Sequence, residues 1–231
     1  MPVFEGPLKG FLWSTHSSYD YLTGGYEDPA VMQTFFSWLR PASVFYDLGA
    51  NVGYYAFLAS QRIETGRIYS FEPIPRNIEI FSKHLELNKG KIRNDIISLE
   101  PLAVSDSEKE VVFSNDPSEV EGNTYVKDRA QGIKVKSYSI DGLVKKGFML
   151  PDIIKIDVEG AEYDVLKGAI DTLRSARPNI LLATHDCHLP GVKDKCIAFL
   201  ESLGYTLQHT GHFNKHVPGL DDYIAIHKDK A

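Results

Sequence analysis

Residues 44–59 read Val-Phe-Tyr-Asp-Leu-Gly-Ala-Asn-Val-Gly-Tyr-Tyr-Ala-Phe-Leu-Ala, two apolar runs joined by a segment with two glycines. The first run predicts a buried strand and the second predicts a helix. Gly49 and Gly53 let the backbone turn sharply and approach a ligand closely, and the free N–H groups at the helix start would face that ligand. The stretch therefore predicts a strand, a turn and a helix that together bind a ligand.

Strand-like runs alternate with helical patterns over the rest of the chain. We expect strands at residues 44–48, 67–72, 96–104, 152–158, 179–185, 205–210 and 223–228, of which the last two can form an antiparallel hairpin. We expect helices after Pro75, across 165–173 and over 192–203, where the helical stripe puts Cys196 in the core. This alternation predicts an α/β fold with a largely parallel sheet.

The length and composition are those of a folded domain. The chain has 231 residues, of which 43% are apolar and 24% charged, and this usage excludes intrinsic disorder and fibrous repeats. We expect one domain over residues 1–231, in which 44–228 form the core and 1–43 an aromatic-rich lead-in. A polar insertion at 113–133 interrupts the alternation. Because long loops in compact domains are commonly functional, we expect the lead-in and the insertion to form walls of a substrate site.

Charge and cysteine content limit the partners and the compartment. The net charge of −6 and the pI near 5.7 leave no overall positive field, so we expect neither a nucleic acid nor a membrane as partner. No apolar run reaches the roughly 18 residues of a spanning helix, and the first residues lack a signal-peptide pattern. Cys187 and Cys196 are too few for a disulfide framework or a zinc cage. We therefore expect a cytoplasmic protein with reduced cysteines.

An acid at the end of the first strand indicates the class of ligand. Dinucleotide sites use Gly-x-Gly-x-x-Gly so that a pyrophosphate can lie against the turn, whereas this chain has Asp47-x-Gly49-x-x-x-Gly53. S-adenosylmethionine carries an ammonium and a sulfonium but no phosphate, so a carboxylate attracts it. Glu72 ends the next strand and can accept both ribose hydroxyls, and Ala103 can border an adenine face. The alternative is a strand, turn and helix that only pack well.

A second acidic cluster follows the fourth expected strand. Ligands bind beyond the carboxyl ends of the strands in open α/β sheets, so we expect Asp157 to face the same crevice as Asp47. Glu159 comes two residues later, and Glu162 is interpreted as a first-turn acid favoured by the dipole of the following helix. His185 ends the next strand and can take the proton from a substrate hydroxyl.

The same cluster offers an alternative as a site for a divalent cation. Carboxylates with an imidazole suit Mg, Mn or Fe, and the candidate ligands are Asp157, Glu159, His185, Asp186 and His188. No helical or short-loop spacing enforces the geometry of such a site, so we expect no metal.

Three motifs resemble those of the FkbM-type S-adenosylmethionine-dependent methyltransferases. They are Asp-Leu-Gly-Ala-Asn-Val-Gly-Tyr-Tyr at 47–55, Phe-Glu-Pro at 71–73 with Asn77 after it, and Ile-Lys-Ile-Asp-Val-Glu-Gly-Ala-Glu at 154–162. The resemblance implies a Rossmann-like class I methyltransferase fold, with a seven-stranded, mostly parallel sheet, an antiparallel last strand and helices on both faces. It also implies that Glu27 lies near the methionine end of the cofactor. Ala183 departs from the pattern, because such sequences often carry an acid two residues before the strand-end histidine.

Together, the residues and the resemblance predict methyl transfer from S-adenosylmethionine to a hydroxyl of a sugar, glycan or secondary metabolite, with S-adenosylhomocysteine as product. The residues expected to bind the cofactor are Glu27, Asp47, Gly49, Asn51, Gly53, Glu72, Asn77, Ala103 and Asp157. His185 is the first candidate for the catalytic base and Glu159 the second. The alternatives are a NAD-dependent Rossmann oxidoreductase and a nucleoside-binding module without catalysis. Methylation of nucleic-acid amino groups is disfavoured, because the chain lacks the Asn/Asp-Pro-Pro-aromatic tetrapeptide of many such enzymes.

Overall fold

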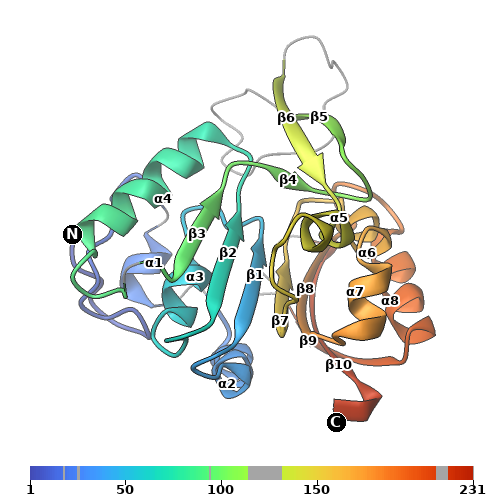
Figure 1. Ribbon diagram of the computed structural model, residues 1–231. Helices are drawn as coiled ribbons and strands as arrows, with labels where there is room; N and C mark the ends of the chain where they lie inside the picture. Colours follow the sequence, from blue (N-terminus) through green and yellow to red (C-terminus); the bar gives the residue numbers. More distant parts are fainter. Residues whose placement is uncertain (18, 25–26, 94, 114–131, 212–217, 231) are drawn as a thin grey trace. The chain divides into compact units, whose positions relative to one another are not determined.

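The computed structural model describes residues 1–17, 19–24, 27–93, 95–113, 132–211 and 218–230. The chain forms two compact units, Met1–Pro101 and Leu102–Ala231 (Figure 1). Most of the polar insertion predicted at 113–133 lies outside the described residues, so its place at a substrate site stays a prediction.

Three parallel strands form the centre of the first unit. The strands are β1 (Val44–Leu48), β2 (Arg67–Phe71) and β3 (Ile97–Glu100), and the helices are α1 (Asp20–Thr23), α2 (Pro29–Trp38), α3 (Tyr54–Ala59) and α4 (Pro75–Leu87). Every residue of β1 is buried, as its apolar sequence predicts. β1 pairs with one edge of β2 and β3 pairs with the other (Figure 1).

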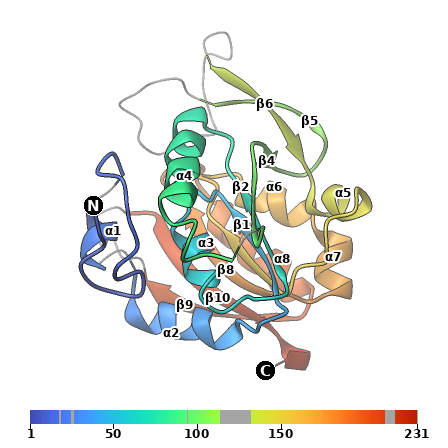
Figure 2. The ribbon, with the colours of Figure 1, turned by 60° about the vertical axis from the view of Figure 1, so that its left-hand side comes forward.

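Local sequence sets the starts of the two long helices of this unit. α2 and α4 begin at Pro29 and Pro75, whose fixed φ suits a first turn and which lack an N–H that would go unpaired there. Asp28 caps α2 by accepting a backbone N–H of its first turn at 2.7 Å. α4, the longest helix of the unit (Figure 2), turns Phe81 and His84 inward.

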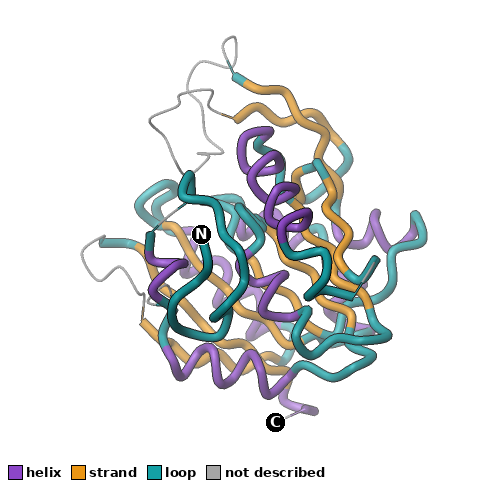
Figure 3. Tube along the Cα trace, turned by 90° about the vertical axis from the view of Figure 1, so that its left-hand side faces the viewer, coloured by secondary structure: helices purple, strands orange, loops and turns teal. Residues whose placement is uncertain are grey.

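The lead-in is part of the core of the first unit. Residues 1–17 contain no helix and only one isolated bridge, between Pro2 and Leu12 (Figure 3). Asn88 holds this segment at the end of α4, since its side chain accepts from Leu12 N at 2.7 Å and donates to Leu12 O at 2.8 Å. Trp13 is fully buried and stacks on His84, with the ring centroids 3.9 Å apart.

The second unit contributes four strands of the large sheet and a small sheet of its own. Its strands are β4 (Ala103–Val104), β5 (Lys109–Phe113), β6 (Ile133–Tyr138), β7 (Ile153–Ile156), β8 (Asn179–His185), β9 (Tyr205–Gly211) and β10 (Leu220–His227). Its helices are α5 (Ile140–Lys145), α6 (Glu162–Lys167), α7 (Ile170–Ser175), α8 (Val192–Ser202) and the 3-10 helix η1 (Lys228–Lys230). β7 and β8 pair in parallel, and the small sheet has the order β4-β6-β5.

The strand order confirms the predicted sheet. The seven strands of the large sheet follow the order β3-β2-β1-β7-β8-β10-β9, and β10, the last strand in sequence, is antiparallel to both of its neighbours. No helix in the described part of the chain is long and apolar enough to cross a membrane.

Several predicted elements differ in extent. The strand predicted at 96–104 is wrong as one element, because Pro101 offers no N–H to a ladder and separates β3 from β4, which pairs with β6. The helix predicted across 165–173 is two helices, with Gly168 ending α6 before α7 begins. The short strands β5 and β6 are not among the predicted strands. The helix predicted over 192–203 is confirmed by α8, with Cys196 buried.

Candidate active site

The turn that follows β1 is built on the positive φ angles of three residues. Gly49, Asn51 and Gly53 have φ values of 73°, 49° and 96°. The N–H groups of Gly49 and Ala50 both donate to the carbonyl of Phe71, each at 3.0 Å, so the turn is fixed to the end of β2. The predicted sharp turn between strand and helix is therefore present, and its glycines occupy backbone conformations that other residues rarely adopt.

Gly53 serves packing as well as conformation. A Cβ atom added at this position would lie 2.4 Å from the ring of Phe81, which is buried on α4. The absence of a side chain therefore lets the first turn of α3 and the inward face of α4 approach each other.

Glu72 lies immediately after β2, and its buried carboxylate is held by three donors. Oε2 accepts the N–H of Asn51 at 2.8 Å, while Oε1 accepts the N–H of Ile74 at 2.8 Å and the side-chain amide of Asn77 at 3.4 Å. The structure thus brings together three residues that the sequence assigned to cofactor binding. A carboxylate oriented by N–H donors at the edge of a glycine turn can present oxygen to the hydroxyls of a ribose.

Two further acids of the first unit lie at or near this turn. Asp47 is fully buried in β1, where Ser70 of β2 is its register partner. Glu27 is half-buried, and it lies close enough to Tyr54 for its charge, after burial of the phenol, to raise the pKa of Tyr54. Because Tyr54 is the first residue of α3, Glu27 lies near the start of the helix that the turn leads into.

His84 links the lead-in to the turn, a role that the sequence did not indicate. The N–H of Ser14 donates to Nε2 at 2.9 Å, so Nδ1 carries the proton, and Nδ1 donates to the carbonyl of Val52 at 2.9 Å. Burial of the ring lowers the pKa of His84 to about 4, and the nearby charges of the N-terminal ammonium and Lys83 act in the same direction. The imidazole is therefore neutral at physiological pH.

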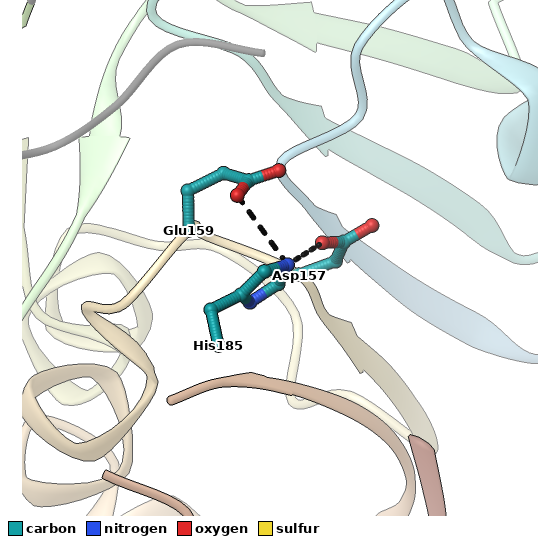
Figure 4. Close-up of side chains that lie close together, drawn as sticks. All are labelled: Asp157, Glu159 and His185. Carbon is teal, nitrogen blue, oxygen red and sulfur yellow. Dashed lines mark ion pairs between the residues drawn. The ribbon is translucent and has the colours of Figure 1, made fainter. Parts of the chain in front are cut away.

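The second unit gathers an imidazole and two carboxylates at the ends of two neighbouring strands. Asp157 follows β7 directly, Glu159 comes two residues later, and His185 ends the parallel strand β8. Nε2 of His185 lies 3.5 Å from Oδ1 of Asp157 and 3.4 Å from Oε2 of Glu159. Figure 4 shows both carboxylates directed at the same nitrogen of the ring.

Glu162 binds the other nitrogen of this ring. Its Oε1 lies 2.7 Å from Nδ1 of His185 and also accepts the N–H of Gly160 at 2.8 Å, and the side chain is fully buried. The sequence interpretation of Glu162 as a first-turn acid is correct for its place in α6 but does not include its contact with His185. Position 183 is alanine, where sequences of this pattern often carry an acid. His185 nevertheless has a carboxylate partner, which is Glu162.

The surrounding charges decide the protonation of His185. Burial of the ring opposes a positive charge, but the hydrogen bond that Nδ1 donates to Glu162 and the charges of Asp157, Glu159 and Glu162 outweigh it and raise the pKa of His185 to about 9. Lys155 Nζ lies 3.1 Å from Oδ2 of Asp157. The cluster is thus a network of ion pairs at neutral pH.

Of the other residues named from the sequence, Asp186 and Ala103 have partners outside this cluster, whereas His188 lies at its edge. Asp186 accepts the N–H of Lys193 at 2.8 Å, in the first turn of α8. Ala103 is buried in β4 beside Ser137 of β6, and its contact with an adenine stays a prediction. His188 Nε2 approaches the cluster at 3.5 Å from Oε2 of Glu159.

Comparisons with known proteins agree with the resemblance in the motifs. The methyltransferase FkbM domain family matches residues 47–207. The hexuronic acid methyltransferase AglP of Haloferax volcanii is 31% identical over 134 residues, which are 57% of this chain and 52% of AglP. The methyltransferase sdnD of Sordaria araneosa is 24% identical over 190 residues, covering 70% of this chain and 73% of sdnD. The chain therefore spans about half the length of AglP.

Solved structures share the fold. A methyltransferase FkbM from Methylobacillus flagellatus KT has a TM-score of 0.56 at 15% identity, over 89% of this chain and 52% of that one. A precorrin-6y C5,15-methyltransferase from Geobacter metallireducens GS-15 has a TM-score of 0.54 at 15% identity, over 94% of both chains. With the glycine turn, the Glu72 carboxylate and a family match over residues 47–207, the chain belongs to the FkbM methyltransferase family.

Proposed function

We propose that the protein transfers a methyl group from S-adenosylmethionine to a hydroxyl of a carbohydrate or a secondary metabolite. The observation that carries the proposal is the Glu72 carboxylate, buried at the edge of the glycine turn and oriented by the N–H groups of Asn51 and Ile74. The family of the chain supports methyl transfer, and its similarity to AglP, a hexuronic acid methyltransferase, supports a sugar acceptor.

The residues of the turn fit a cationic, phosphate-free nucleoside. Asp47 is a fully buried acid in the strand that leads into the turn, where it would repel a pyrophosphate and attract an ammonium. Glu72 would hold the ribose, while Asp47 and Glu27 would bind at the methionine end. When bound, S-adenosylmethionine supplies an electrophilic methyl group. The same fit argues against the NAD-dependent alternative. The turn of this chain also lacks the third glycine of a dinucleotide-binding motif.

The cluster after β7 and β8 would manage the proton of the acceptor. His185 is positively charged at neutral pH because three carboxylates surround it, so we place Glu159 ahead of His185 as the proton acceptor. His185 would hold Glu159 in position through their 3.4 Å contact. Positioning of the acceptor oxygen would account for most of the rate, since alignment alone can contribute roughly 7–11 kcal/mol.

The experiment that tests the function is transfer of a labelled methyl group to defined acceptors. Hexuronic acids, neutral hexoses and hydroxylated secondary metabolites are offered with labelled S-adenosylmethionine, and S-adenosylhomocysteine binding is measured by calorimetry. We expect binding of S-adenosylhomocysteine and labelling of one hydroxylated class. Binding without labelling of any class would favour a nucleoside-binding module, and binding of NADH in place of S-adenosylhomocysteine would favour an oxidoreductase.

A further inference from the structure

We propose that Asp157, Glu159 and His185 bind one divalent cation of the Mg²⁺ or Mn²⁺ class. Each residue offers one ligand atom, and the three atoms lie within 4.8 Å of one another. The inference reverses the expectation of no metal that was drawn from sequence spacing. Of the five candidate ligands named there, the structure brings the ligand atoms of three together. It also goes beyond the proposed methyl transfer, because cation binding does not depend on which acceptor is methylated.

The distances suit a small octahedral ion. Neighbouring ligand atoms around an ion with bonds of about 2.1 Å are separated by roughly 3 Å. Nε2 of His185 lies 3.5 Å from the Asp157 oxygen and 3.4 Å from the Glu159 oxygen. Shifts of about half an ångström bring each carboxylate oxygen to this separation from Nε2. The two oxygens lie within 4.8 Å of each other, so they can take opposite positions around the ion, which are about 4.2 Å apart.

The contact between Glu162 and His185 is the second observation that points to a metal. A metal-binding histidine almost always donates its other ring N–H to a carboxylate or carbonyl, which fixes the tautomer and aims the free nitrogen at the ion. Glu162 Oε1 makes this contact with Nδ1 at 2.7 Å, and Nε2 faces the two candidate ligands. The N–H of Gly160 donates to the same Oε1 at 2.8 Å, so a backbone contact helps to hold the carboxylate against the ring.

The named groups of the cluster have a net negative formal charge, which favours binding of a cation. Three carboxylates, of Asp157, Glu159 and Glu162, stand against one ammonium, that of Lys155 at 3.1 Å from Asp157. Binding of a cation displaces the proton that His185 carries in the ion-free cluster, and with the imidazole neutral these groups have a formal charge of −2. One divalent cation balances the formal charge of these named groups, whereas a proton on His185 changes their formal sum only to −1.

The composition of the ligand set indicates the class of metal. Two carboxylates and one imidazole favour hard cations such as Mg²⁺ and Mn²⁺ over ions that prefer thiolates. The side chains of Asp157 and Glu159 are 29% and 19% exposed, against 5% for His185, so solvent can reach the carboxylate side of the ion. Water or an acceptor hydroxyl can thus complete the coordination there.

The first test is titration of the chelator-stripped full chain with Mn²⁺ alone, followed by the electron paramagnetic resonance signal of free Mn²⁺. We expect one saturable site per chain and displacement by Mg²⁺. Asp157→Asn and Glu159→Gln should each weaken Mn²⁺ binding at least about tenfold, and Glu162→Gln should weaken it by about 10- to 100-fold through the orientation of His185. Absence of saturable binding at millimolar Mn²⁺ would overturn the inference.

Glu110→Gln is the matched control. It removes the same charge from a side chain on β5 that is 58% exposed and pairs with Lys134 at 2.9 Å. We expect it to bind Mn²⁺ like the original protein. Equal affinity in Glu110→Gln and Glu159→Gln, with both variants folded, would also overturn the inference.

A second measurement needs no variant and so does not depend on variant folding. In protein with isotope-labelled histidine, substoichiometric Mn²⁺ should broaden the ring signals of His185 and then His188, and should broaden least those of His227, at the opposite end of β10 from the register partner of His185. Uniform broadening would mean surface binding only and would refute the site. S-adenosylhomocysteine binding, measured in parallel, separates the two proposals, because its loss bears on the proposed function and not on the cation.

Discussion

The backbone N–H of Ser14 donates to Nε2 of His84 across 70 positions of sequence, at 2.9 Å. The opposite nitrogen of the same ring donates to the carbonyl of Val52, inside the turn that follows β1. One neutral imidazole therefore joins the lead-in to the candidate cofactor turn. The stacked indole of Trp13 covers the ring, so these hydrogen bonds form away from water.

Replacing His84 by phenylalanine should cost stability. His84→Phe keeps an aromatic ring against Trp13 but leaves the Ser14 N–H and the Val52 carbonyl without their partner. Two buried polar groups without hydrogen bonds should lower the free energy of unfolding by about 2–4 kcal/mol. Urea unfolding measures the loss, and His16→Phe, at an exposed histidine of the same segment, should change it by less than about 0.5 kcal/mol. Equal effects of the two substitutions would contradict the role given to His84.

The same residue predicts how stability depends on pH. The pKa of His84 is about 4 in the folded chain, mainly because the ring is buried, whereas an unburied histidine has a pKa of 6.5. As the pH falls, the unfolded chain therefore binds the proton first. The free energy of unfolding should therefore fall as pH drops from about 6.5 to about 4, by up to about 3 kcal/mol. Urea unfolding across this pH range measures the free energy of unfolding of the original protein and of His84→Phe. The difference between the two gives the contribution of His84, because the carboxylates titrate in both proteins. Parallel pH profiles for the two proteins would refute the assignment.

Sequence alone predicts the elements whose signal is local and leaves out those that depend on distant partners. β1, α4 and α8 carry strong apolar runs or helical stripes and are confirmed. β5 and β6 flank the polar insertion and are short and charged, so their apolar signal is weak. The alternation Ile-Lys-Val-Lys at 133–136 matches the alternating burial of β6 and is the sequence signal that could have predicted this strand.

The same limit applies to the candidate site. Asn51, Glu72 and Asn77 follow from motif spacing because the turn and the end of β2 are close in sequence. The contact of Glu162 with His185 spans 23 positions, and only the pairing of β7 with β8 reveals it. His84, a polar residue on α4, faces the core, and the apolar residue next to it, Leu85, is only half-buried.

Glu72→Gln tests the ribose assignment. The substitution keeps the shape but removes the charge and turns an amide toward the N–H groups of Asn51 and Ile74, which already require an acceptor. We expect binding of S-adenosylhomocysteine to weaken by about 10- to 100-fold, the equivalent of one or two charged hydrogen bonds. Calorimetry measures the change, and Glu79→Gln, on the exposed side of α4, is the control that should bind normally. Undiminished binding in Glu72→Gln would remove this residue from the cofactor site.

Glu159→Gln tests the chemistry of the second unit. Loss of a proton acceptor should lower turnover by about 10²- to 10⁴-fold while the affinity for S-adenosylhomocysteine stays within about twofold. Exposed Glu201→Gln on α8 should retain full turnover in the same labelled-methyl assay. Unchanged turnover in Glu159→Gln would exclude the residue from proton transfer.

Addition of Mn²⁺ to Glu159→Gln distinguishes the two roles given to this carboxylate. Turnover that returns with excess Mn²⁺ indicates a ligand that only helps to hold the ion. Turnover that stays low with the site saturated indicates a proton acceptor. Either result is read against Glu201→Gln under the same conditions.

Two glycine substitutions separate backbone strain from steric overlap. Gly10→Ala introduces a Cβ at φ 87° with nothing within 4 Å, and should cost about 1 kcal/mol for the conformation alone. Gly53→Ala, at φ 96°, adds an overlap with the Phe81 ring and should cost about 2–4 kcal/mol. Phe81→Leu should recover part of the second cost and none of the first. Thermal and urea unfolding give the comparison, and equal losses in the two alanine variants would show that Phe81 simply moves aside.

The fit of Gly53 against Phe81 constrains the order in which this family member can change. A side chain at position 53 would overlap the ring at position 81, and a smaller residue at 81 would remove that overlap at the cost of a cavity beside α3. Because φ at position 53 is 96°, such a change would remove the steric reason for glycine and leave the conformational one. Position 81 should therefore accept substitution more readily than position 53.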